Sequence, residues 1–130
     1  MAEAVMMKNS GDGYRRADDG SWGKIPVAKT AAYTVTAQEV GTVFTNTGSS
    51  ATVVFTLPIP KGGEWFTFVK SVTNKSIELQ APTGVSINGG TAAKKYANTA
   101  TDKGTCTIVA ISATEYVVQA EKGTWATNDS

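Results

Sequence analysis

The chain has 130 residues, a formal net charge of +1 and a pI near 7.8. This length supports one hydrophobic core, and the near-neutral charge provides no field that would draw the chain to nucleic acid or to an anionic membrane. The sequence has no histidine and one cysteine, which excludes imidazole-based catalysis, histidine-ligated metal sites and an intrachain disulfide.

The first 29 residues differ in character from the rest of the chain. They are rich in glycine and charge and show no regular alternation, so we expect an irregular N-terminal arm over residues 1–29 and a single domain over residues 30–130. The start of the chain carries Glu3 where a secretory leader would carry bases, and its apolar run is short. We therefore expect no targeting segment, and synthesis in a reducing cytoplasm.

One group of residues in the arm has the composition of a protein interface. Two arginines lie close to aromatic residues, and interfaces are enriched in both because guanidinium groups make paired contacts and rings bury large areas at small entropic cost. The alternative is a solvated loop that packs Trp22 against its own domain. The predicted contact residues of the arm are Tyr14, Arg15, Arg16, Trp22 and Ile25, with Asp18 and Asp19 between them.

Two Asp-Gly pairs in the arm, Asp12-Gly13 and Asp19-Gly20, raise the question of a calcium loop. Such a loop needs alternating oxygen ligands and a distal bidentate glutamate, and the arm has neither arrangement. Turn formation by Asp-Gly explains these pairs better. The sequence therefore predicts no metal site.

After the arm, short runs of Thr, Val, Phe and Ile alternate in hydrophobicity and are separated by glycine, proline and asparagine. Eight such runs predict an all-β domain, either a single antiparallel β-sandwich or a small jelly-roll-like barrel. No stretch carries the sustained apolar spacing of a long helix. The predicted strands are residues 32–37, 40–46, 51–57, 64–72, 76–80, 85–88, 104–112 and 115–119.

The clearest alternation lies in residues 65–72. Phe66, Phe68 and Val72 share one face, whereas Trp65 and Val69 fall among the polar residues of the other face. Burial on both faces predicts a central strand or a subunit interface, so Trp65 joins the predicted contact residues. The predicted core residues are Phe55, Phe66, Phe68, Ile77, Leu79, Ile108 and Val118.

Three polar segments are predicted to be connections. Residues 47–50 should form a hairpin turn, and residues 58–63 a loop, because Pro58 and Pro60 cannot lie inside a paired central strand. Residues 91–103 should form a surface loop. Within it, Tyr96 and the adjacent Lys94 and Lys95 could contact sugar or nucleic acid, but the interleaved aromatics of a stacking platform are missing, which favours a solvated loop.

Few residues of the domain suggest catalysis. Cys106 alternates in phase with Ile108 and Ala110, and no basic neighbour would lower its pKa, so we interpret it as a small buried hydrophobe rather than a reactive thiol. Asp102 and Glu115 are acids of the kind that a glycosidase pairs, but nothing in the sequence places them together. We expect no catalytic residues and no cofactor, and therefore not an enzyme.

Several short motifs follow one another across the domain. They are YTVTA (33–37), GTVFTNTG (41–48), VFTLP (54–58), GEWFTFV (63–69), IELQAPTGVSINGG (77–90), TIVA (107–110), YVV (116–118) and GTW (123–125). In this order they resemble a small β-module of tailed-bacteriophage virion proteins. That module occurs in head decoration (cement) proteins and in tail fibres and spikes, and no catalytic motif accompanies it.

The resemblance implies a decoration protein that binds the outer surface of the capsid as a homotrimer and stabilises the shell. Its partners would be further copies of itself and the major capsid protein, and its location the virion after synthesis in the host cytoplasm. A module that forms a short chain with its own N-terminal arm is expected to be a decoration protein. A tail-fibre module, by contrast, usually lies within a much longer chain. A receptor-binding or structural module of a tail fibre or spike stays open as the alternative.

Overall fold

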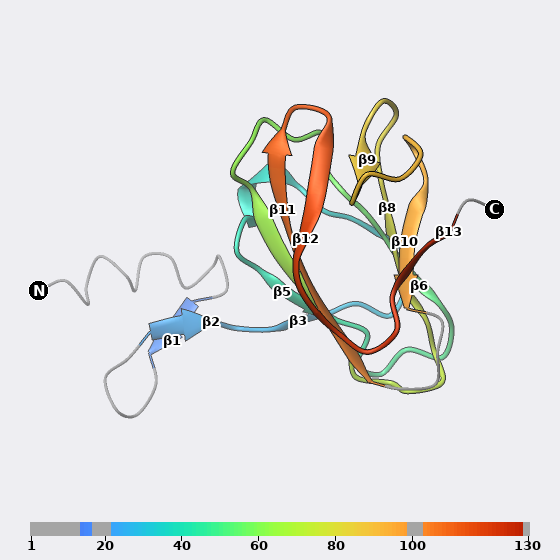
Figure 1. Ribbon diagram of the computed structural model, residues 1–130. Coiled ribbons are helices and arrows are strands. Elements are labelled where there is room, and N and C mark those ends of the chain that lie inside the picture. The colour runs from blue at the N-terminus through green and yellow to red at the C-terminus, as the bar shows by residue number, and fades with distance from the viewer. Residues whose placement is uncertain (1–13, 17–21, 99–102, 129–130) are drawn as a thin grey trace, which may run out of the picture.

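The computed structural model describes residues 14–16, 22–98 and 103–128, and it is an all-β structure. Two sheets pack face to face as a sandwich (Figure 1). The short 3-10 helix η2 (Ala37–Glu39) is the single helical element among these residues. The predicted sandwich is confirmed.

The strands are short and fall into three sheets. The six-stranded sheet has the order β3 (Val27–Ala28), β5 (Val43–Thr45), β7 (Trp65–Lys70), β11 (Gly104–Ser112), β12 (Glu115–Lys122) and β9 (Ser86–Ile87). The five-stranded sheet has the order β13 (Ala126–Asn128), β10 (Lys95–Asn98), β8 (Ile77–Gln80), β6 (Val53–Thr56) and β4 (Tyr33–Thr34). Within the predicted arm, β1 (Tyr14–Arg16) and β2 (Trp22–Lys24) pair with each other.

From β3 to β8, consecutive strands alternate between the two large sheets. Strands that are next but one in the chain therefore lie side by side and run parallel, as in β3 with β5 and β6 with β8. Residues 47–50 accordingly do not form a hairpin, because they carry the chain from β5 in one sheet to β6 in the other. The sheets are mixed, so the expectation of a purely antiparallel sandwich is wrong.

Antiparallel pairing dominates the second half of the domain. β11 pairs antiparallel with β7 on one side and with β12 on the other. In the opposite sheet, β10 pairs antiparallel with β8 and with β13. Side chains along β7 and β11 alternate between the core and the outer face of the sheet.

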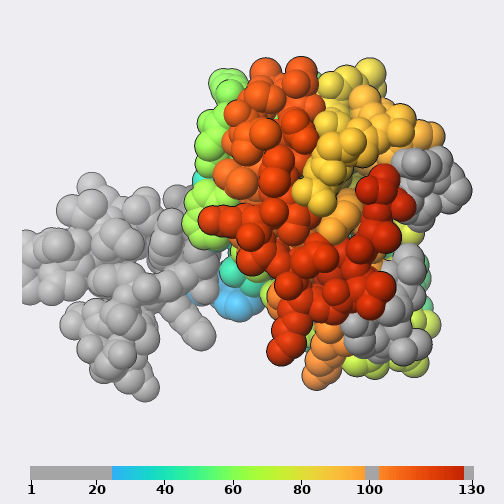
Figure 2. All heavy atoms as spheres, in the orientation of Figure 1, coloured from blue at the N-terminus to red at the C-terminus, as the bar shows by residue number. Residues whose placement is uncertain are grey.

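β10 lies where the sequence predicts a surface loop, and that prediction is wrong. Tyr96 is buried, and its ring stacks on Trp125 with the centroids 6.0 Å apart. The Tyr96 hydroxyl donates a hydrogen bond to the Glu121 carboxylate; burial and this bond both raise the pKa of Tyr96. Figure 2 shows the C-terminal segment, in red, covering this side of the sandwich. Tyr96 is therefore not part of an exposed binding patch.

The core follows the predicted alternation. Phe55, Phe66, Phe68, Ile77, Leu79 and Ile108 are all fully buried, and Val118 is half-buried against them. The rings of Phe44, Phe55 and Phe68 contact one another, with centroids 5.1 to 5.6 Å apart. Because these rings come from β5, β6 and β7, this aromatic cluster joins the two sheets.

Candidate assembly surface

The outer face of the six-stranded sheet carries apolar and threonine side chains. Along β7, Phe66 and Phe68 point into the core, so Trp65, Thr67 and Val69 lie on the opposite face. β11 runs antiparallel beside them and continues the same surface. We call this surface the outer sheet face; its residues are Trp65, Thr67, Val69, Thr105, Thr107, Val109, Ile111 and Val117.

Large apolar side chains of this face are exposed. Trp65 is 43% exposed and Ile111 is 59% exposed. A hollow of about 410 Å³ lies over the sheet beside Trp65, lined also by Thr67, Thr107, Val109 and Gln119. The hydroxyls of Thr67 and Thr107 are 2.9 Å apart and satisfy each other across the two strands. A sheet face with an uncharged, hollowed centre and an exposed tryptophan is typical of a contact surface.

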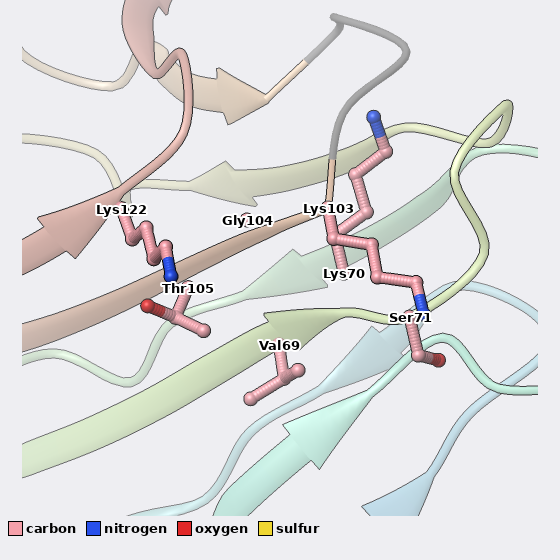
Figure 3. Close-up of a pocket in the computed structure, with 7 residues that line it drawn as sticks. All are labelled: Val69, Lys70, Ser71, Lys103, Gly104, Thr105 and Lys122. Carbon is pink, nitrogen blue, oxygen red and sulfur yellow. The ribbon is translucent and has the colours of Figure 1, made fainter.

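One end of the outer sheet face is basic. A second hollow, of about 310 Å³, lies at the junction of β7 and β11 and is lined by Val69, Ser71 and Thr105. Exposed Lys103 and Lys122 border it, and Lys122 extends toward Thr105 (Figure 3). A partner that covers the whole face would therefore meet an apolar centre and a positive edge.

The predicted contact residues occupy three separate parts of the chain. Trp65 lies on the outer sheet face, and Ile25 is half-buried just before β3. Tyr14, Arg15, Arg16 and Trp22 belong to the β1–β2 hairpin, whose register places Arg16 opposite Trp22. Asp18 and Asp19, like the Asp12-Gly13 pair, lie outside the described residues. Ile111 was not among the predicted contact residues, although the alternation of Thr105, Thr107 and Val109 extends to it.

The single cysteine lies in the core of the sandwich. Cys106 is fully buried, and burial, followed by the negative charge of Glu121, raises its pKa to about 12. Asp102 lies outside the described residues, so the structure does not test its pairing with Glu115. In the described part of the chain, no three residues of the types His, Cys, Asp and Glu group as a metal site.

The buried thiol leads to a direct prediction. Folded protein should resist alkylation of Cys106 by iodoacetamide at mildly alkaline pH, because the reactive thiolate is scarce and the sulfur is shielded. The same reagent should label the unfolded chain fully. Intact-mass measurements with and without denaturant check this, with a cysteine introduced at exposed Thr114 in a Cys106→Ala background as the reactive control. Equal labelling rates for the two thiols in folded protein would contradict the assignment.

Comparison with protein-family models gives no match for this chain, and comparison with curated proteins gives none either. Among the described residues, no helix has the length and apolar character needed to cross a membrane.

Proposed function

We propose that this protein is a bacteriophage head decoration protein that binds the outer surface of the capsid as a homotrimer and stabilises the shell. The observation that carries the proposal is the outer sheet face, whose centre is uncharged and which exposes Trp65 and Ile111 on a two-sheet sandwich. The order of motifs between residues 33 and 125, which resembles the phage virion module, supports the same class.

A second copy of this chain is the occupant that the outer sheet face fits best. Side chains that lie close to a three-fold axis approach their equivalents in the other two copies, and identical charges would repel there. The centre of the face carries Trp65, Thr67 and Val109, none of which is charged. Interfaces between identical subunits are also more apolar than transient ones. The lysines at the edge of the face would then lie away from the axis.

Attachment to the capsid is assigned to the arm. Tyr14, Arg15, Arg16 and Trp22 supply aromatic and guanidinium groups within the β1–β2 hairpin, and such groups dominate binding energies at interfaces. A trimer presents three arms at once, which would raise the apparent affinity by about two to four orders of magnitude over one arm. The protein would thus act through multivalent contact, without turnover.

Deletion of residues 1–24 should abolish binding to capsids and leave a folded trimer. The lost contacts would contribute about 2 to 4 kcal/mol per subunit, multiplied in effect by the trimer. The measurement is co-sedimentation with undecorated heads, with circular dichroism and analytical ultracentrifugation of the truncated protein. Binding at the affinity of the full chain would contradict the role of the arm.

Trp65→Lys provides the matched test of the trimer, because it places a charge on the outer sheet face. Ile59, which is 71% exposed in the loop before β7, lies outside this face, so Ile59→Lys is the control. Only Trp65→Lys should be monomeric in ultracentrifugation.

Antibody labelling of virions separates the proposal from the alternative, a module of a tail fibre or spike. Label on the heads would support a decoration protein, and label on the tails would support the alternative.

A further inference from the structure

A lysine lies in the core of the sandwich. Lys70 ends β7, in phase with Phe66 and Phe68, and its side chain is 0% exposed. Lysine is almost never buried this completely unless it has a specific partner. Its Nζ donates a hydrogen bond to Oδ1 of Asn98 at 3.1 Å. Asn98 is also 0% exposed and ends β10, so this contact joins strands of opposite sheets.

The other end of the Asn98 amide is unsatisfied. Its Nδ2 is buried and has no hydrogen-bond partner among the described residues. The amide lies directly against Gly104 of β11, since a Cβ built on that glycine would be 2.2 Å from Nδ2. Burying an amide NH₂ without a partner is costly, and such sites in folded proteins call for an explanation.

We propose that Lys70 and Asn98 form an intramolecular isopeptide bond. The lone pair of the uncharged Lys70 amine attacks the side-chain carbonyl carbon of Asn98, and a new C–N bond forms. The bond from that carbon to Nδ2 breaks, and Nδ2 leaves as ammonia after taking one proton from Nζ. The products are one secondary amide and one ammonia molecule, so no oxidant, cofactor or further reactant is needed.

The geometry and burial of the pair suit this step. Because the carbonyl bond is about 1.2 Å long, Nζ lies within about 4.3 Å of the carbon that it would attack. Reacting atoms in near-attack geometry are about 3 to 3.5 Å apart, so a small side-chain movement suffices. Burial favours the uncharged, nucleophilic form of an amine and excludes the water that would hydrolyse an activated amide. The unpartnered Nδ2 is the atom that leaves.

Such a bond would tie the two sheets together covalently. β7 belongs to the six-stranded sheet and β10 to the five-stranded sheet, and the described contact between their last residues would become permanent. The closed loop between positions 70 and 98 would also restrict the unfolded chain, as a disulfide does. This inference does not depend on the proposed function, because it concerns the folded domain alone.

Mass spectrometry of the full-length protein tests the proposal. After prolonged incubation in the folded state, the intact mass should be lower than the sequence mass by one ammonia molecule. Trypsin does not cleave after an acylated lysine, so the digest should contain a branched peptide that joins residues 62–75 to residues 96–103. Lys70→Met and Asn98→Ala should each lack the branched peptide, whereas Lys75→Met, which alters a nearby lysine outside the core, should retain the cross-link and the mass loss.

One other reaction would give the same loss of mass. Asn88 precedes Gly89 in an exposed turn, and an Asn-Gly sequence can lose ammonia by closing a succinimide on its own backbone. That product is not branched, so peptide mapping distinguishes the two. A folded wild-type protein with the full sequence mass, or with the ammonia loss confined to Asn88, would overturn the proposal. Neither outcome depends on whether the variants fold.

Discussion

Phe68→Ala should lower the free energy of unfolding by about 3 to 5 kcal/mol. Phe68 is fully buried, and its ring contacts Phe44 and Phe55 with centroids 5.6 and 5.1 Å away. Its removal would leave a cavity between the two sheets, and the facing rings come from separate strands that cannot close it without moving both. Urea denaturation followed by tryptophan fluorescence measures the loss.

Ile59→Ala is the control for that experiment, because Ile59 is 71% exposed in the loop before β7 and lies outside the outer sheet face. Its truncation should cost about 1 kcal/mol or less in a monomer. A cost for Phe68→Ala that is no larger than that of the control would show that the aromatic cluster does not hold the sheets together. Comparable slopes of the denaturation curves are needed for the two values to be compared.

Gly104→Ala should be the next most damaging substitution, with a loss of about 1 to 3 kcal/mol from overpacking. The added Cβ would lie 2.2 Å from Nδ2 of Asn98, 3.0 Å from the carbonyl oxygen of Lys122 and 3.0 Å from Nε1 of Trp125. These groups come from three different segments, and two of them are held by the hydrogen bond from Trp125 to Lys122. The methyl group would therefore have to displace β10, β12 or the C-terminal segment.

Thermal and urea denaturation of Gly104→Ala measure this effect. Thr105→Ala changes the next residue, whose side chain lies on the outer sheet face, and should cost about 1 kcal/mol or less. If Gly104→Ala matched that control, the crowding around Gly104 would be relieved without cost. The close approach of the Asn98 amide to β11 would then not be a fixed feature of the fold.

Alternation along β7 was sufficient to predict which side chains enter the core. Phe66 and Phe68 are buried and Trp65 lies on the outer sheet face, as the period of two requires. The same alternation does not indicate which strand lies beside β7. Strands of both sheets have one face toward the core, so they show the same pattern whatever their neighbours are. The parallel pairing of β5 with β7 therefore could not be predicted from it.

The sequence predictions failed where burial depends on distant residues. β10 reads KYAN, which has no apolar alternation, and Tyr96 is buried because Trp125 stacks on it from the end of the chain. Lys70 is different, since its position in phase with Phe66 and Phe68 already placed it on the inward face. The alternation carries no information about Asn98, which the structure places within hydrogen-bond distance of Lys70.

The path of the chain from β3 to β8 also determines how the domain can fold. Each parallel pair forms only after the chain has crossed to the opposite sheet and returned, so each pair begins with the entropy cost of closing a long loop. Within the described sandwich, β11 and β12 are the neighbours joined by a two-residue turn, at Ala113 and Thr114. That hairpin therefore closes the shortest loop of any neighbouring pair in the described sandwich and has the smallest loop-closure cost.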